Sequence, residues 1–87
     1  MNASLPVLYV KSGCPWCIDV TAFMAKHGIA HREKNVSLDA EAMAEMRRLS
    51  GQSKAPVLDW NGTLLSDFGV EELVPFLKNL NVKLTER

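Results

Sequence analysis

The segment LPVLYVKSGCPWCIDVTAFMAKHG, residues 5–28, predicts a strand, a tight loop and a helix in direct succession. The run from Leu5 to Val10 is rich in β-branched and aromatic residues, which is typical of a buried strand. No glycine or further proline interrupts the chain from Pro15 to His27, and Gly28 follows where a helix commonly ends. Pro15 suits the first helical turn, where its missing N–H costs nothing. Both cysteines therefore lie at a junction between a strand and a helix.

A second strand and a second helix are expected next. Residues 30–36 show a weaker strand pattern that is polar on average. Asp39 is placed to cap a helix that ends at Ser50-Gly51. The apolar stripe of this helix consists of Met43, Met46 and Leu49. Because the first two strands flank a crossover helix, they should run parallel.

The last third of the chain predicts a hairpin and a third helix. Pro56 introduces a strand, Asn61-Gly62 is a strong hairpin signal, and residues 63–66 form the returning strand. Pro75 lies inside the pattern of the third helix and should either kink that helix or mark its late start. The apolar stripe of the third helix consists of Val70, Leu73, Val74, Leu77 and Leu80.

The predicted order of elements is β-α-β-α-β-β-α, which defines an α/β fold. It corresponds to a four-stranded mixed sheet flanked by three helices, the minimal thioredoxin-like layout. No repeat, linker or low-complexity segment divides the chain, and 87 residues suit one small domain. We therefore predict a single domain over residues 1–87.

The composition argues against several classes of partner. The chain carries ten basic and ten acidic residues, so its formal net charge is zero. Nucleic-acid binding needs a basic excess on some face, and none is indicated. The apolar runs are far shorter than a membrane span, and no basic segment precedes the first of them. We therefore expect a cytoplasmic protein with no membrane partner, in which two closely spaced cysteines are catalytic or metal-binding.

The two cysteines are suited to redox chemistry. Cys14 falls at or just before the first helical turn, where free N–H groups and the helix dipole favour the nucleophilic thiolate. Lys11 adds a positive charge, and Cys17 lies one turn further along on the same face. We therefore predict that Cys14 attacks a disulfide and that Cys17 resolves the mixed disulfide. Two merely buried thiols are the other interpretation, against which the flanking Gly13 and Pro15 argue.

The spacing of the cysteines and histidines also suggests a zinc site, because Cys14, Cys17, His27 and His31 read C-x2-C-x9-H-x3-H. Along a helix, however, His27 lies roughly 15 Å from Cys17 at a rise of about 1.5 Å per residue. Zinc ligands lie within about 2.3 Å of the ion, so one ion cannot bridge the two pairs. No metal is expected. His27 should complement the dipole at the helix end, and His31 should be an exposed strand residue.

Three segments resemble those of the glutaredoxin family. YVKSGCPWC, residues 9–17, is similar to the active-site pattern K-x-x-C-P-Y-C, with tryptophan in place of the usual tyrosine. SGQSKAPVLDWNG, residues 50–62, is similar to the T-V-P segment, which implies that Pro56 is cis. LLSDFGVEEL, residues 64–73, departs from the usual I-G-G-x-D/S-D-L and is closer to small redoxins that serve ribonucleotide reductase. The resemblance covers nearly the whole chain.

This resemblance implies a site for glutathione, which acts as a co-substrate. Lys11 should pair with the glycine carboxylate of glutathione, and Lys54 should reinforce that contact. The backbone of Ala55, just before Pro56, should pair with the cysteinyl part like an added strand. Trp16 should form one wall of the site.

The other end of the implied site departs from the family pattern. Backbone N–H groups of Phe68 and Gly69, near the start of the third helix, should receive the γ-glutamyl carboxylate. The usual acidic residue that meets the γ-glutamyl amine falls at Gly69, which has no side chain. Asp67 or Glu71 is expected to take its place.

The function implied by the resemblance is that of a monomeric thiol–disulfide oxidoreductase. Its partners would be glutathione and proteins that carry disulfides or glutathione mixed disulfides. One alternative is a redoxin reduced by thioredoxin reductase, which the SDF segment at residues 66–68 motivates. Another is a carrier that holds an iron–sulfur cluster between two chains. Pro15 argues against the carrier, since a rigid proline after the nucleophile disfavours cluster assembly in the family.

Overall fold

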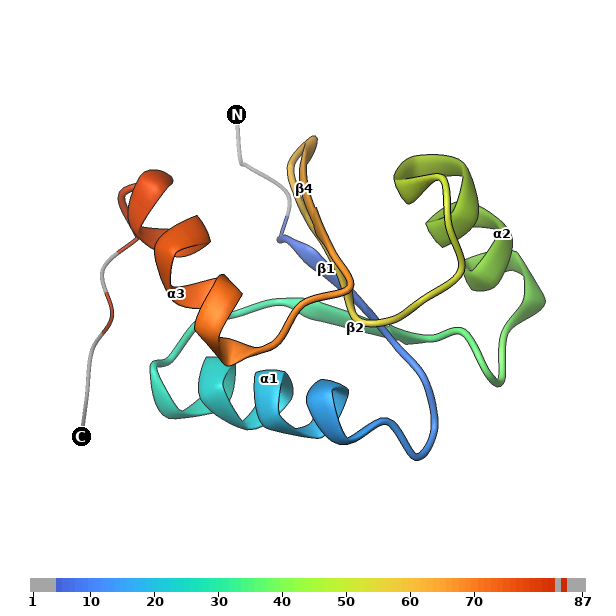
Figure 1. The fold of residues 1–87 in the computed structure, drawn as a ribbon, viewed down its shortest axis with the longest axis horizontal. Helices are drawn as coiled ribbons and strands as arrows, with labels where there is room; N and C mark the ends of the chain where they lie inside the picture. The colour runs from blue at the N-terminus through green and yellow to red at the C-terminus, as the bar shows by residue number, and fades with distance from the viewer. Residues whose placement is uncertain (1–4, 83, 85–87) are drawn as a thin grey trace.

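The computed structural model describes residues 5–82 and 84, and its elements follow the predicted order (Figure 1). The strands are β1 (Val7–Val10), β2 (Arg32–Asn35), β3 (Val57–Trp60) and β4 (Thr63–Ser66). The helices are α1 (Pro15–Lys26), α2 (Ala40–Ser50) and α3 (Val70–Asn79). The predicted α/β fold class is thereby confirmed. None of the helices in the described ranges is long and apolar enough to cross a membrane.

The four strands form one mixed sheet in the order β2-β1-β3-β4. β1 and β2 are parallel, as the crossover through α1 requires, whereas β3 is antiparallel to both β1 and β4. Pairing begins at Val7 opposite Arg32, so the first strand is shorter than the apolar run that predicts it. The polar sequence of β2 fits its place at an edge of the sheet, where one side is not paired.

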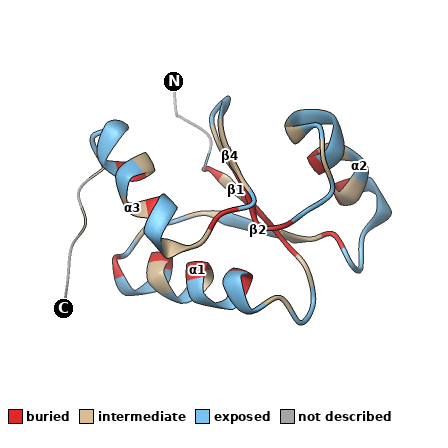
Figure 2. Ribbon diagram, in the orientation of Figure 1, coloured by how far each residue is buried: buried red, intermediate tan, exposed pale blue. Residues whose placement is uncertain are grey.

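The helices cover the sheet on both sides. Figure 1 shows α1 and α3 together on one side, with α2 on the other. Apolar side chains of the two central strands and the helices meet between these layers, and Figure 2 shows the buried positions along β1 and the inward-facing sides of the helices. The largest fully buried side chains are Leu8, Met24, Met46, Leu58, Leu73, Leu77, Val20, Val57 and Pro56.

The ends of the helices follow the predicted signals with one exception. The Asp39 carboxylate accepts the N–H groups of Glu41 and Ala42 at 3.0 and 3.2 Å, and Gly51 ends α2 with a φ of 74°. Of the two alternatives predicted for Pro75, the late start is wrong, because α3 begins at Val70 and includes Pro75 within it. Proline has no N–H to donate to the carbonyl one turn earlier, and Pro75 lies on the exposed side of the helix.

A polar cluster ties α2 to the sheet on the side away from α1. The Tyr9 hydroxyl and the Lys34 ammonium each donate a hydrogen bond of 2.8 Å to Oε1 of Glu45. Burial, and then the hydrogen bond to Glu45, raise the pKa of the Tyr9 phenol. The hydrogen bonds from Lys34 and Tyr9 lower the pKa of Glu45. The cluster joins β1, β2 and α2 through one carboxylate oxygen.

Candidate active site

The loop that carries the first cysteine is held in place by short polar contacts. Gly13 adopts a φ of 72°, in the left-handed region that favours glycine, and this turns the chain from β1 into α1. The Ser12 N–H donates to Oγ of Ser37 at 3.1 Å, and the Asn35 amide donates to Oγ of Ser12 at 3.2 Å. The loop is therefore fastened to the end of β2.

Cys14 is the N-cap of α1, as predicted. Its carbonyl accepts the N–H of Ile18 at 3.1 Å, and its Sγ accepts the N–H of Cys17 at 3.2 Å. Pro15 occupies the first turn, where no N–H is needed. Cys14 is partly exposed, and neither cysteine forms a disulfide in the structure.

Cys17 has a different environment from its partner, because only 3 % of its surface is exposed. Burial, followed by the hydrogen bond with Cys14, raises the pKa of the Cys17 thiol to about 12. A buried thiol with such a pKa is a poor nucleophile toward an incoming molecule. The two cysteines thus differ in exposure and in the pKa of their thiols.

A second loop, which connects α2 to β3, also borders the pocket near Cys14. The peptide bond between Ala55 and Pro56 is cis, which confirms that expectation. The Pro56 carbonyl accepts the N–H of Asp67 at 2.9 Å, and this joins the loop to the segment before α3. The Gln52 side chain donates to the Lys54 carbonyl at 3.1 Å and accepts the Lys54 N–H, so it fixes the peptide units of that residue.

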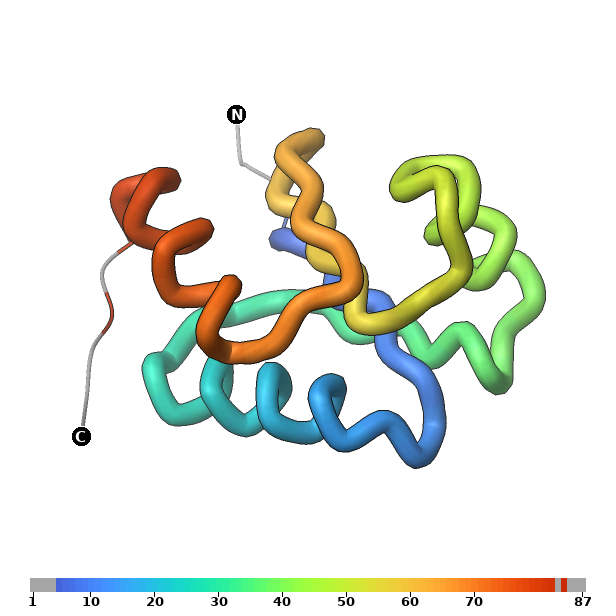
Figure 3. Tube along the Cα trace, in the orientation of Figure 1, coloured from blue at the N-terminus to red at the C-terminus, as the bar shows by residue number. Residues whose placement is uncertain are grey.

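Figure 3 traces the segment before β3 and the segment before α3 on the same side of α1. An open pocket of about 1030 Å³ lies among these segments and the start of α1. Cys14 lines it, whereas Cys17 and Pro56 are buried and do not. Trp16 stands over the pocket with 60 % of its surface exposed. The predicted residues that the structure gathers here are Lys11, Cys14, Trp16, Lys54, Ala55, Asp67, Phe68 and Gly69.

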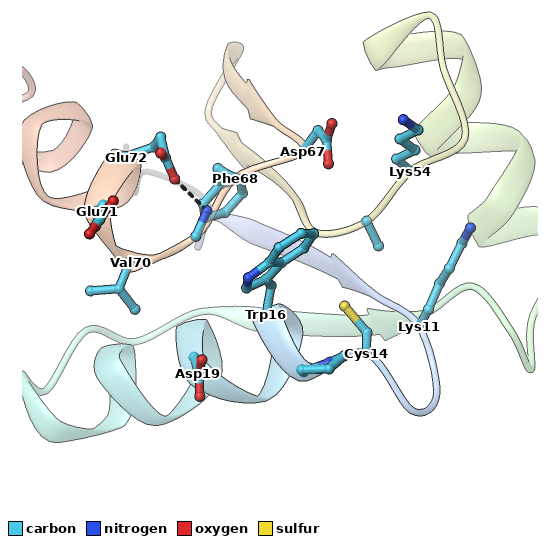
Figure 4. Close-up of a pocket in the computed structure, with 13 residues that line it drawn as sticks. Lys11, Cys14, Trp16, Asp19, Lys54, Asp67, Phe68, Val70, Glu71 and Glu72 are labelled. Atoms are coloured by element: carbon cyan, nitrogen blue, oxygen red, sulfur yellow. Dashed lines mark hydrogen bonds between the residues drawn. The ribbon is translucent and has the colours of Figure 1, made fainter.

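The charges of the pocket are divided between its two ends. Figure 4 shows Lys11 and Lys54 on one side of Cys14 and Trp16. Three acidic side chains lie on the other side, and a fourth borders the pocket above the indole ring. These acidic residues are Asp19, Glu71, Glu72 and Asp67. An elongated ligand would therefore meet positive charge at one end of the pocket and negative charge at the other.

The start of α3 differs from the expected anion-binding arrangement. The Gly69 N–H, predicted to receive a ligand carboxylate, donates instead to Oε1 of Glu72 at 2.8 Å. Glu72 is the third residue of α3, the usual position from which a glutamate reaches back to the N-cap. The Gly69 N–H thus donates its hydrogen bond to a carboxylate of the protein itself.

The two histidines lie away from the cysteines. His27 follows the last turn of α1, where it is buried and its ring centroid is 4.3 Å from that of Phe23. His31 is not the exposed strand residue expected, because it lies just before β2 with 12 % of its side chain exposed. Its Nε2 is 3.7 Å from Oε1 of Glu33. Among the described residues, no three potential metal ligands converge.

Several residues that shape the site do not stand out in the sequence. Ser12, Asn35 and Ser37 form contacts across two loops that no local pattern indicates. Gln52 hydrogen-bonds to a residue only two positions away, yet glutamine is not a common turn residue, so the sequence does not indicate this contact. Glu72 could have been found, since it lies three residues after the N-cap Gly69.

The comparisons with known proteins agree with this geometry. The family model described as Glutaredoxin matches residues 7–65. A glutaredoxin-like 8.6 kDa protein in the rubredoxin operon of Clostridium pasteurianum is 32 % identical over 66 residues, which are 76 % of this chain and 88 % of that protein.

Solved structures show the same fold. The thioredoxin-like protein BC3987 superposes with a TM-score of 0.75 at 25 % identity, over 83 % of this chain and 99 % of that one. Glutaredoxin grx-1 from Archaeoglobus fulgidus gives a TM-score of 0.74 at 17 % identity, over 88 % and 89 % of the two chains. The matched residues include β1, both cysteines and the cis proline. The chain is therefore a thioredoxin-fold redox protein and belongs to the glutaredoxin family.

Proposed function

We propose that the protein is a glutathione-dependent thiol–disulfide oxidoreductase. The observation that carries this proposal is the pair of unlike cysteines at the start of α1. Cys14 is accessible at the pocket and receives an N–H at its sulfur, whereas Cys17 is buried one turn further along. In this arrangement the Cys14 sulfur can attack a disulfide, and the buried Cys17 sulfur can then resolve the mixed disulfide.

The proposed cycle begins when the Cys14 thiolate attacks one sulfur of a protein disulfide. A mixed disulfide forms, and the leaving sulfur departs as a thiolate that takes up a proton. The Cys17 sulfur, after losing its proton, attacks Cys14 and releases the second thiol of the substrate. Two molecules of glutathione then reduce the Cys14–Cys17 disulfide and leave as glutathione disulfide, so two electrons pass through each cycle.

A glutathione mixed disulfide follows a shorter route. Cys14 attacks the glutathione sulfur, and the protein substrate leaves as a thiol. A second glutathione then attacks the glutathione sulfur that is bonded to Cys14, which yields glutathione disulfide and releases the Cys14 thiolate. Cys17 takes no part in this route.

The residues at one end of the pocket support the proposal that glutathione is the reductant. Lys11 and Lys54 offer two ammonium groups for the glycine carboxylate, at the end of the pocket away from Asp19, Glu71 and Glu72. Ala55 is held by the cis peptide bond at the pocket wall, where its backbone can pair with the cysteinyl residue.

The experiment compares Cys14→Ser, Cys17→Ser and the unmodified protein in reducing a glutathionylated peptide. We expect Cys14→Ser to be inactive and Cys17→Ser to retain most of its activity with this substrate. Activity in Cys14→Ser would refute the assignment of the nucleophile. A second assay supplies either glutathione or thioredoxin reductase with NADPH, and a protein that only the reductase can reduce would refute the choice of glutathione.

A further inference from the structure

A second hollow borders the redox helix, apart from the pocket that Cys14 lines. It is an open groove of about 380 Å³ between α1 and the end of the sheet formed by β1 and β2. Most of the side chains that line it are apolar or small, and they include Val10, Cys17, Ile18, Ala22 and Ala25. The two cysteines therefore border different hollows, Cys14 the pocket and Cys17 this groove.

The groove follows from the alternation of side chains along the two strands. Tyr9 and Lys34 project toward α2, where both donate hydrogen bonds to Glu45. Because successive side chains of a strand point to opposite faces, the neighbouring Val10 and Glu33 project toward α1. β2 is an edge strand of the described sheet, so the groove stays open along that edge.

Ile18 is the most exposed large apolar residue of the groove. It lies one helical turn after Cys14, whose carbonyl accepts the Ile18 N–H at 3.1 Å, and 65 % of its surface is exposed. Trp16 and Ile18 are two of the five large hydrophobic residues that are exposed in the described part of the chain. A single exposed apolar side chain needs no explanation, but two beside a reactive sulfur and next to an apolar groove indicate a contact surface.

A polypeptide that forms a disulfide with Cys14 is the partner that would cover this surface. Lys11 lines both hollows, so the groove adjoins the pocket. The rise along α1 from Cys14 is about 6 Å to Ile18 and about 12 Å to Ala22. An extended peptide spans these distances with about two to four residues. Glutathione has only one residue on each side of its cysteine and is too short to fill the groove.

We propose that the groove between α1 and β2 is a docking site for an apolar side chain of a polypeptide substrate, two to four residues from the cysteine that Cys14 attacks. Ile18 is its specificity-determining residue. This inference rests on the proposed function and names a substrate class for it, polypeptide disulfides with an apolar residue near the reacting cysteine. Burial of that side chain against Ile18 and Ala22 favours such substrates over those with a polar residue there.

The test uses two neutral peptides of nine residues, each with a cysteine at its centre that is joined to 2-pyridinethiol as a mixed disulfide. One peptide carries leucine three residues before and after the cysteine, and the other carries serine there. The Cys14 thiolate attacks the cysteine sulfur of the peptide, and 2-pyridinethiolate leaves, so its absorbance gives the rate. Each rate constant is divided by that of the same disulfide with dithiothreitol. We expect the leucine peptide to react about fivefold faster than the serine peptide.

Two variants change the groove in different ways. Ile18→Ser removes an apolar wall, and Ala22→Gln places a polar side chain in the groove without interrupting the helix. We expect each to remove most of the preference for leucine, whereas Ile18→Val should keep it. Leu38→Ser is the matched control, because Leu38 is 81 % exposed and lines neither hollow. The 2-pyridinethiol disulfide of glutathione should react equally with all these variants.

The outcomes separate this inference from the proposed function. Equal rate constants for the two peptides, or a preference that both groove variants retain, would overturn the docking site while the oxidoreductase activity stood. Sedimentation of the reduced protein tests another occupant of the groove. If Ile18→Ser converts a dimer to a monomer, the groove is an interface between two copies of the chain, and the proposal fails. If no disulfide releases 2-pyridinethiol in a reaction that requires Cys14, the proposed function itself fails.

Discussion

The backbone N–H of Cys17 points at the sulfur of Cys14, 3.2 Å away, in the first turn of α1. One residue thus supplies two different groups to the redox site: an amide that contacts the first sulfur and a thiol that is itself buried. Because both belong to the same helical turn, the backbone itself fixes the different environments on which the proposed attacking and resolving roles depend.

The two thiols should differ in their reaction with iodoacetamide. At pH 7.5 we expect modification of Cys14 alone, because it is accessible and Cys17 is 3 % exposed. The pKa of Cys17 is raised to about 12, so its thiolate fraction should rise about tenfold with each pH unit through the range from 8 to 11. Peptide mapping by mass spectrometry gives both rates. Equal modification of the two cysteines at pH 7.5 would contradict this assignment.

The lysine end of the pocket should control the affinity for glutathione. Lys11→Gln removes one of two ammonium groups there, and we expect KM for glutathione to rise about two- to fivefold at low salt, with a smaller effect in 0.5 M salt. Lys78→Gln makes the same change of charge on α3 outside the pocket and should leave KM unchanged. Equal effects of the two variants on KM would show that it depends on the net charge of the protein and not on the position of the lysine.

Gln52 should act as a positioning residue for the loop before the cis proline. Its side chain holds both peptide groups of Lys54, so Gln52→Ala should loosen that segment. We expect a rise of about threefold in KM for glutathione and an unchanged rate of Cys14 alkylation, since the sulfur lies on another element. Ser53→Ala in the same exposed loop is the matched control. A slower alkylation of Cys14 in Gln52→Ala would instead indicate a general disturbance of the fold.

The Glu45 cluster should stabilise the protein in a pH-dependent manner. The pKa of Glu45 is lowered by Lys34 and Tyr9, so its contribution is present above about pH 4.5 and is lost as the pH falls through the lowered value. We expect Glu45→Gln to reduce the free energy of unfolding by about 0.5–1 kcal/mol at pH 7 and by less at pH 3. Urea denaturation at both pH values measures this. An equal loss at both values would exclude the ionic origin.

A variant of Tyr9, the buried residue of the cluster on β1, tests the same hydrogen bond. Tyr9→Phe removes the hydroxyl that donates to Glu45 and should cost about 1 kcal/mol at pH 7. Combined with Glu45→Gln, its effect should be less than additive, because both changes remove the same hydrogen bond. Full additivity would show that the two side chains contribute independently.

The fold was predictable because its signals are local. Asp39 and Gly51 mark the two ends of α2, and the structure places both as the sequence predicts. Asn61 and Gly62 have positive φ values in the turn between β3 and β4, which these residue types tolerate. Each of these positions depends on a few neighbouring residues, so the chain alone is sufficient to locate it.

The details of the site were less predictable because they depend on side-chain contacts between distant segments. The occupation of the Gly69 N–H by Glu72 follows from a side-chain conformation that the sequence permits but does not require. Pro75 illustrates another difficulty, since a proline pattern cannot distinguish a late helix start from a proline carried inside the helix. The partial burial of His31 depends on how the chain enters β2, which no short sequence pattern indicates.

The burial of Cys17 leaves Cys14 as the one cysteine that lines the pocket. In the proposed cycle, the electron donor and the electron acceptor must therefore use Cys14 in turn and cannot engage it together. Such a protein alternates between two stable forms, and its kinetics should be of the ping-pong type. A large excess of either partner then slows the reaction of the other, because both compete for the Cys14 sulfur. The ratio of donor to acceptor therefore limits the rate of electron transfer.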